Sequence, residues 1–137
     1  MPNLCPDSSC VECGGKGRIA TGREACPTRP ERASWVYWLC GCGAYVSCHR
    51  GTAIPMGRPA NGRTRAWRIK AHAALDHRWM RFGGKTNKHT ITRARPKAYA
   101  WLAAQLGLTL DKCHIGLFDE AMCQRVIAVC EQVRKAA

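Results

Sequence analysis

The chain has 137 residues, ten cysteines and a formal net charge of +13, and a chain of this length can bury a core without cross-links. The sequence does not open on a charged segment followed by an apolar run, and no apolar run approaches the about 20 residues of a membrane span, so we expect neither a signal peptide nor a membrane partner. We therefore expect a reducing cytoplasm, where cysteines bind metal or stay free, and the alternative is that they form disulfides in an oxidising compartment.

Four cysteines form two tight pairs, each followed by glycine: Cys10-Val-Glu-Cys13-Gly and Cys40-Gly-Cys42-Gly. We call these two cysteine pairs the first and the second knuckle. Two such pairs separated by about 15–30 residues are typical of one tetrahedral Zn²⁺ site. The glycines allow the positive φ angles that aim N–H groups at sulfur. Four thiolates leave zinc no open position, so we interpret the site as structural. Because the second pair has one intervening residue where two are usual, Cys5 or Cys26 could replace a ligand.

Residues 1–57 are predicted to form a zinc-ribbon-like unit. The aromatic and β-branched run 33–39 predicts a strand that enters the second knuckle, and residues 44–48 predict the return strand of a β-hairpin. Residues 14–32, rich in Gly, Pro and charge, predict a long and partly mobile excursion. The Gly- and Pro-rich residues 51–62 predict either a linker or an ordered crossover loop.

Residues 58–137 are predicted to form a basic lobe of three helices. Apolar residues at helical spacing predict the first helix from about residue 64 to residue 82, ended by two glycines. Residues 85–95 lack apolar periodicity and predict a flexible loop that orders on a ligand. A second helix is predicted from about Pro96, a residue suited to the first helical position, to Leu106.

The third helix is predicted to begin at Asp119, whose side chain caps the free N–H groups of its first turn. Phe118 and Cys123 have the spacing of a hydrophobic staple around that cap. The predicted fold class is therefore α+β, with a zinc-ribbon-like β-hairpin unit, residues 1–57, packed on a small three-helix lobe, residues 58–137, in one compact domain.

The positive charge is concentrated in one block. Residues 58–97 carry twelve basic residues and only Asp76, a net charge of +11. Such a block is typical of proteins that contact a polyanion, most often DNA or RNA, and the alternative is a solvated face without a ligand. No helix-turn-helix or ββα-finger spacing is present, which favours sequence-tolerant binding. The side chains predicted to contact a nucleic-acid backbone are Arg63, Arg65, Arg68, Lys70, Arg78, Arg81, Lys85 and Lys88.

A second group of potential ligands comes from three segments: Cys48 and His49, His72 and Asp76, and Cys113 and His114. His72 and Asp76 are four residues apart on a predicted helix and so share a face. If the three segments converge, the group could hold a second metal or form a polar network. With an open coordination position it could also be the centre of a metal-dependent hydrolase or nuclease. The alternative is that these residues pack in the core.

Several aromatic residues lie near the predicted hairpin: Trp35, Tyr37, Trp38 and Tyr45. Aromatic side chains can stack on unpaired bases, although in a small ribbon they more often cover the core. Both interpretations stay open at this point.

Four strings follow one another along the chain: Cys40-Gly-Cys42-Gly-Ala-Tyr-Val-Ser-Cys48-His49, Ala71-His72-Ala-Ala-Leu-Asp76, Ala98-Tyr-Ala-Trp-Leu-Ala103, and Cys113-His114-Ile-Gly-Leu-Phe-Asp119 with Cys123. Together they resemble a phage- and prophage-associated family of zinc-finger-containing domains of unknown function, from about Cys10 to about Cys130. The second knuckle of that family resembles Cys-x-x-Cys, from which this chain departs by one residue.

The resemblance implies a zinc site and an origin in a mobile element, and hence the cytoplasm of a host cell. It also suggests an alternative to nucleic-acid binding, in which a phage-encoded inhibitor binds a host nucleic-acid enzyme or a defence complex directly, in the manner of an anti-CRISPR protein. Such an inhibitor would not mimic DNA, because a mimic must be acidic.

Overall fold

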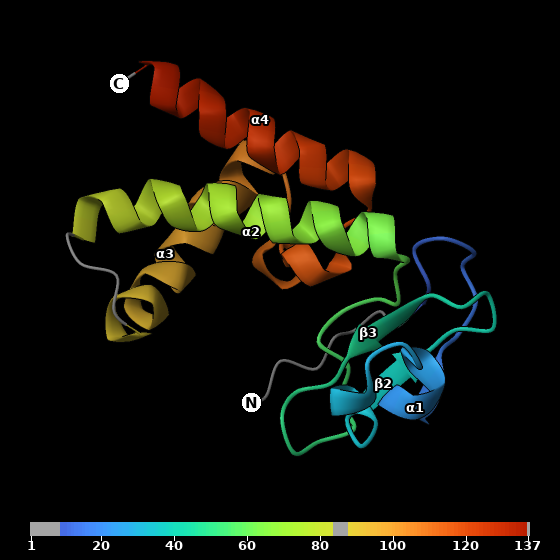
Figure 1. The fold of residues 1–137 in the computed structure, drawn as a ribbon. Helices are drawn as coiled ribbons and strands as arrows, with labels where there is room; N and C mark the ends of the chain where they lie inside the picture. Colours follow the sequence, from blue (N-terminus) through green and yellow to red (C-terminus); the bar gives the residue numbers. More distant parts are fainter. Residues whose placement is uncertain (1–8, 84–87, 137) are drawn as a thin grey trace. The chain divides into compact units, whose positions relative to one another are not determined.

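The computed structural model describes the backbone of residues 9–83 and 88–136 and the side chains of residues 9–77 and 96–132. The chain divides into two compact units, Met1–Arg65 and Ala66–Ala137 (Figure 1). The described elements are a three-stranded antiparallel sheet, four α-helices and three short 3-10 helices, so the predicted α+β class is confirmed. Among the described helices, none is long and apolar enough to cross a membrane.

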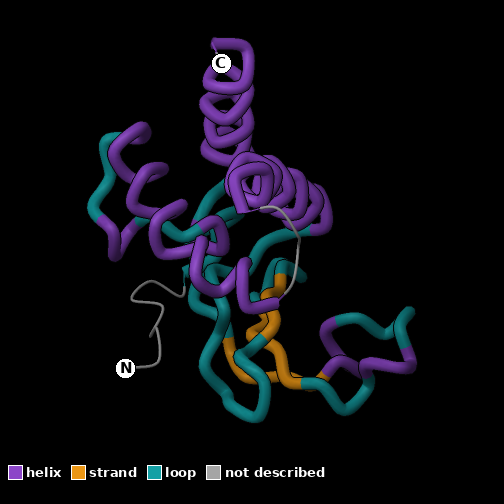
Figure 2. Tube along the Cα trace, turned by 90° about the vertical axis from the view of Figure 1, so that its left-hand side faces the viewer, coloured by secondary structure: helices purple, strands orange, loops and turns teal. Residues whose placement is uncertain are grey.

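The N-terminal unit is built on an antiparallel sheet with the strand order β1-β2-β3, whose strands are orange in Figure 2. The strands are β1 Arg18–Thr21, β2 Val36–Leu39 and β3 Tyr45–Ser47. In the pair β2 and β3, Trp38 lies opposite Val46, and the second knuckle is the turn between the two strands. The predicted hairpin is therefore confirmed.

Residues 14–32 carry more regular structure than the sequence predicted. β1 pairs with β2 with Ala20 opposite Tyr37, and it is followed by a short helix, α1 (Gly22–Ala25). A four-residue strand with a single buried side chain is too short to show a clear alternation. Its order comes from pairing with the aromatic strand β2, which local sequence does not reveal.

The Gly- and Pro-rich residues 51–62 form an ordered crossover loop, which is one of the two predicted alternatives. Isolated bridges join Cys48 to Pro55 and Tyr45 to Ala60, so the loop returns along β3. The indole N–H of Trp38 donates to the carbonyl of Ala53 at 2.8 Å. These contacts hold the chain that leads from the second knuckle to the first long helix.

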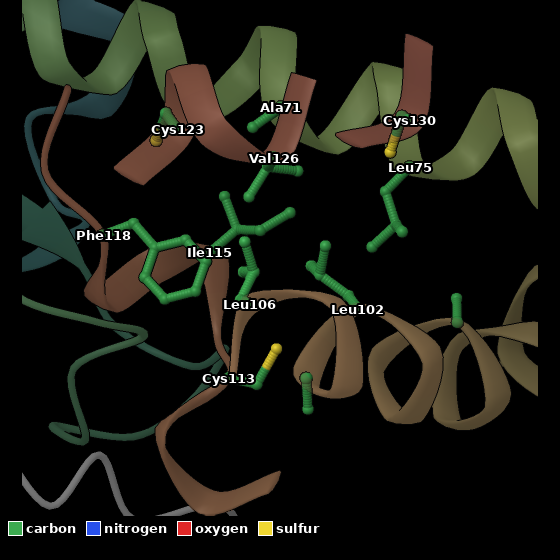
Figure 3. Close-up of a cluster of buried hydrophobic side chains, with 12 residues drawn as sticks. Ala71, Leu75, Leu102, Leu106, Cys113, Ile115, Phe118, Cys123, Val126 and Cys130 are labelled. Carbon is green, nitrogen blue, oxygen red and sulfur yellow. The ribbon is translucent and has the colours of Figure 1, made fainter. Parts of the chain in front are cut away.

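The C-terminal unit packs three helices around one apolar core, with two short 3-10 helices, Leu110–Lys112 and Ile115–Leu117, between the second and third. The helices are α2 (Gly62–Gly83), whose first turn up to Arg65 belongs to the N-terminal unit, α3 (Lys88–Leu106) and α4 (Glu120–Ala136). Figure 3 shows side chains of all three converging on Ile115. The labelled core side chains are Ala71, Leu75, Leu102, Leu106, Cys113, Ile115, Phe118, Cys123, Val126 and Cys130.

The second helix is longer than predicted, because α3 begins at Lys88 and carries Pro96 in its interior. The predicted loop over residues 85–95 is therefore wrong from Lys88 onward, while the three residues before it lie outside the described part. Lys, Arg and Ala have high helix propensity. Pro96 removes one N–H from the helix but does not prevent a helix from continuing as a kinked one.

The predicted helix ends agree with the structure at two places. Gly107, just past α3, has a φ of +69°, and the N–H of Leu108 donates to the carbonyl of Ala103 at 2.9 Å, the pattern of a Schellman cap. At α4 the N–H of Met122 donates to Oδ1 of Asp119 at 2.9 Å, so the predicted N-cap is confirmed.

Candidate metal centre

The first knuckle is a tight turn closed by backbone hydrogen bonds. The N–H of Gly14 donates to the carbonyl of Cys10 at 2.9 Å, and Gly14 has a φ of +76°. Two further N–H groups point at sulfur: Glu12 donates to Sγ of Cys10 at 3.3 Å, and Gly15 donates to Sγ of Cys13 at 3.4 Å. Because N–H donors stabilise the thiolate form, this turn is prepared for a metal.

The second knuckle closes with one residue fewer. The N–H of Gly43 donates to the carbonyl of Cys40 at 2.9 Å, three residues earlier, and Gly43 has a φ of +95°. The first knuckle instead closes over four residues, from Gly14 to Cys10. The shorter turn still directs Cys42 to the other sulfurs, because a glycine at positive φ completes each turn.

The four knuckle sulfurs lie within 4.8 Å of one another. Sγ of Cys10 is 3.6 Å from Sγ of Cys42, and Sγ of Cys13 is 3.3 Å from Sγ of Cys40. A zinc tetrahedron with Zn–S bonds of about 2.3 Å has S···S edges of about 3.8 Å. The donor set therefore fits Zn²⁺, with two ligands buried and two exposed.

The electrostatics of the cluster call for a cation. At Cys13 the N–H of Gly15 lowers the thiol pKa, but the neighbouring thiols of Cys40 and Cys42 outweigh it and raise the pKa to about 12. Several thiolates this close repel one another, so they keep their negative charge only when a metal ion lies among them. Zn²⁺ supplies the compensating positive charge, and its binding releases the protons of the thiols.

Of the two alternative ligands, Cys26 does not join the cluster. Cys26 is buried and lies outside the group of four. The thiol of Cys26 lies beside Tyr37. Burial is the main cause that raises the pKa of the Tyr37 phenol, and the neighbouring Cys26 thiol raises it further. Cys5 lies outside the described residues.

The two knuckles together hold the segment that begins α2. The backbone N–H of Val11 donates to the carbonyl of Pro59 at 3.1 Å, and the guanidinium of Arg58 donates to the carbonyl of Ser9 at 2.8 Å. On the other side, Tyr45 and Ala60 exchange two backbone hydrogen bonds of 3.1 Å each. The segment is therefore fixed by residues next to both halves of the metal site.

Glu12, inside the first knuckle, caps α2. Asn61 is the N-cap residue, and its Oδ1 accepts from the N–H of Thr64 at 2.9 Å. Oε2 of Glu12 accepts from the backbone N–H of Asn61 at 2.9 Å and from the hydroxyl of Thr64 at 2.8 Å. In a capping box a glutamate three residues into the helix makes the first of these bonds. Here Glu12, a residue of the first knuckle, makes that bond instead.

Sequence reasoning missed Glu12 as a structural residue. The N-cap itself had a signal, since Asn61 and Thr64 have the spacing of a capping motif. The partner lies about fifty positions earlier, and no local pattern points to it.

The second group of potential ligands is divided between the units: Cys48 and His49 belong to the N-terminal unit, and His72, Asp76, Cys113 and His114 to the C-terminal unit. Within the described ranges, the knuckle cysteines are the one group of three or more Cys, His, Asp or Glu side chains whose ligand atoms come together.

His72 makes contacts typical of a structural histidine. Its Nδ1 lies 3.0 Å from the carbonyl of Arg68, which can only accept, so Nδ1 carries the proton. Its Nε2 lies 3.5 Å from the hydroxyl of Tyr99, whose ring centre is 5.6 Å from that of His114. Tyr99 thus lies between the two histidines. Cys113 packs in the apolar core, and burial raises its thiol pKa to about 11.

The basic residues predicted to contact phosphates differ in their accessibility. Arg63 and Lys70 are exposed. Arg68 is only 6% exposed and its Nε donates to the carbonyl of Phe118 at 2.9 Å, so its assignment to a nucleic-acid surface is corrected. Arg65 is half-buried, with its guanidinium 3.7 Å from the centre of the Tyr45 ring. The side chains of Arg78, Arg81, Lys85 and Lys88 lie outside the described part.

The comparison with known families agrees with this geometry. The family model of a zinc-finger-containing domain matches residues 7–133, nearly the whole chain, and the protein belongs to that family. No curated protein and no solved structure matches the chain. The family, the four converging sulfurs and the prepared knuckles together identify a zinc-binding protein.

Proposed function

We propose that this zinc-binding protein binds nucleic acid through the basic residues of its helical part, mainly without sequence preference. The observation that carries the proposal is the net charge of +11 on residues 58–97. Lys and Arg neutralise phosphates and release counterions, which supplies most of the free energy of sequence-tolerant binding.

The exposed side of α2 offers a surface suited to a phosphate backbone. Exposed residues recur at helical spacing along the helix: Arg63, Ala66, Lys70, Ala73 and His77. The basic side chains reach outward, while the small alanines between them allow a backbone to approach closely. Lys70 also lies 4.6 Å from the ring centre of Trp67, a cation–π contact that restricts its motion.

The capped start of α2 supports the same proposal. Glu12 and the paired strand residues beside Ala60 fix the first turn of this helix to the metal site. A helix whose first turn is capped loses less conformational entropy on binding than a flexible basic segment does. The zinc centre would then act as a support, since four thiolates leave no open position for chemistry.

The proposal can be tested by comparing a double variant that removes two exposed charges inside the basic block with one that removes two exposed charges outside it. The double variant Arg63→Gln/Lys70→Gln should reduce the slope of log K against log[salt] by about 1.8 for a labelled duplex, since each lost phosphate contact contributes about 0.9. Lys112→Gln/Arg125→Gln removes the same charge from exposed positions outside the block. Equal slopes for the two double variants would contradict the proposed surface.

The alternative is a phage-encoded inhibitor that uses the same basic surface against a host protein complex. It rests on the resemblance to a phage-associated family and on the charge block. A pull-down from nuclease-treated host lysate separates the two functions. Retention of one stoichiometric protein, combined with no nucleic-acid binding by the purified protein, would favour the inhibitor. For the hydrolase alternative, no observation among the described residues provides a supporting site.

A further inference from the structure

The ribbon unit carries an unusually exposed tryptophan. Trp35 is 50% exposed, although tryptophan is one of the most buried residue types on average. The other aromatic side chains near the hairpin are covered: Tyr37 is 2% exposed, and Trp38 and Tyr45 are half-buried. Of the four aromatic residues considered for base stacking, the structure leaves Trp35 as the accessible one.

The backbone around Trp35 is anchored on both sides. Its N–H donates to the carbonyl of Arg32 at 3.0 Å, and its carbonyl accepts from the N–H of Gly22 at 2.8 Å. The N–H of Arg23 donates to the carbonyl of Ala33 at 3.2 Å. A side chain at position 22 would overlap the carbonyl oxygen of Arg32, so the two segments pack as closely as backbones can. The exposed indole is therefore presented by a fixed loop.

The charges around the indole are positive. The guanidinium of Arg32 lies 4.9 Å from the centre of the Trp35 ring. Arg23, whose backbone N–H donates to the carbonyl of Ala33, is also exposed. The acidic residues of this stretch have partners of their own, since Glu24 pairs with Arg18 and Glu31 with Arg29. Residues 16–36 carry a net charge of +3.

Exposed apolar side chains adjoin this loop on the sheet. Val36 is 39% exposed and lies opposite Thr21, and Ile19, two residues earlier on β1, is 55% exposed. Residues two apart on a strand share a face, so Ile19 and Val36 are diagonal neighbours on one side of the sheet. They form a further exposed apolar surface of the ribbon unit.

From these observations we propose that Trp35 is a stacking site for an unpaired base, which makes single-stranded DNA or RNA a ligand of the ribbon unit. The base stacks on the indole face opposite Arg32, and Arg23 and Arg32 neutralise the flanking phosphates. A planar aromatic surface beside cations is the combination that sequence-tolerant single-strand binding uses. A duplex hides its base faces and would gain only the charge contacts. The inference rests on the proposed function and assigns it a preferred ligand.

The test compares Trp35→Ala and Trp35→Phe with the unchanged protein, each loaded with zinc. Binding is measured by anisotropy with labelled oligothymidylate, oligouridylate and a mixed-sequence duplex, each about 15 nucleotides long. Trp35→Ala should weaken binding to the single strands roughly 5- to 150-fold and change duplex affinity less than about twofold. Trp35→Phe, which keeps an aromatic face, should retain most of the single-strand affinity. The two single-stranded probes show whether DNA or RNA is preferred.

Leu110→Ala is the matched control, because it removes an exposed apolar side chain, 60% exposed, from the other unit. Zinc content and the unfolding midpoint report whether each variant is folded. If the unchanged protein shows salt-dependent binding and Trp35→Ala has the same affinity for single strands, the stacking site is overturned and the proposed function stays intact. Trp35 would then be a candidate contact for a protein ligand. Absence of binding to every probe at low salt would overturn both.

Discussion

Glu12 connects the first zinc knuckle to the start of α2 through one carboxylate oxygen. That oxygen accepts a backbone N–H and a hydroxyl, at 2.9 and 2.8 Å. Hydrogen bonds to a charged acceptor are among the stronger ones in proteins. A single side chain therefore joins the metal site to the helix that carries the basic residues.

Replacing Glu12 should weaken this connection measurably. We expect Glu12→Ala to lower the free energy of unfolding by about 1–2 kcal/mol, the range of lost caps and charge-assisted hydrogen bonds, and Glu12→Gln to lower it less, because an oxygen acceptor remains. Urea unfolding of the zinc-loaded protein measures both. Glu31→Ala, which removes an exposed acid 3.9 Å from Arg29, should change stability by less than about 0.5 kcal/mol. Equal effects at positions 12 and 31 would show that the capping contact is unimportant.

Gly22 is a second residue whose environment decides the outcome of a substitution. A Cβ at this position would overlap the backbone of Arg32, which no rotamer change relieves. We expect Gly22→Ala to destabilise the protein by about 1–3 kcal/mol, as overpacking does. Gly41, where a Cβ meets nothing within 4 Å, provides the control. A Gly22→Ala variant as stable as Gly41→Ala would be inconsistent with the close packing of the Trp35 loop.

Single residues also show where the sequence was informative. The tight Cys-Gly pattern predicted which four residues belong to the metal site, because the knuckle geometry is local and both glycines are needed for the turns. Arg68 was grouped with the phosphate contacts because it lies in the basic block of residues 58–97. Its burial depends on the carbonyl of Phe118, about fifty residues later, and charge counting along the chain cannot reveal such a partner.

Among helices and strands, too, the features with local causes were predicted from the sequence, and those that depend on distant residues were not. The ends of α3 and α4 were predicted closely because caps are local, with Gly107 after one helix and Asp119 before the other. β1 was missed because four residues show too little periodicity and depend on β2 for pairing. The start of α3 was placed too late because Pro96 resembles a first helical residue, yet the helix runs through it.

The cap of α4 gives a prediction at this scale. Asp119→Ala should lower the free energy of unfolding by about 1 kcal/mol, because the N–H of Met122 loses its acceptor. Asp119→Asn keeps an acceptor oxygen at the same place and should cost less than half as much. Thermal or urea unfolding followed by helical circular dichroism distinguishes the two. If the asparagine variant is as unstable as the alanine variant, the hydrogen bond is not the source of the effect.

For the molecule as a whole, the division into two units has a consequence for metal removal. Among the residues whose side chains the structure describes, the N-terminal unit has a small buried cluster of Cys10, Cys40 and Ala44, whereas the C-terminal unit has twelve buried residues in one core. Structural zinc supplies much of the folding free energy of small metal-dependent units. The two units should therefore respond differently to a chelator.

Hydrogen exchange in the presence of a zinc chelator tests this difference. We expect amides of β2 and β3 to lose protection, while amides of α3 from Ala98 to Leu106 keep theirs. Restoring zinc should restore the protection of the strands. Simultaneous loss of protection in both units would mean that they unfold as one cooperative structure, and unchanged protection in the strands would mean that zinc does not support the sheet.

We propose that the exposed basic residues of the helical part bind nucleic acid through its phosphates. The most direct measurement is the affinity of the zinc-loaded protein for one labelled duplex at salt concentrations from about 50 to 200 mM. If about four or more phosphates are neutralised, the affinity falls by roughly 100-fold over this range. Binding that is absent at the lowest salt concentration, or that does not change with salt, would contradict the claim.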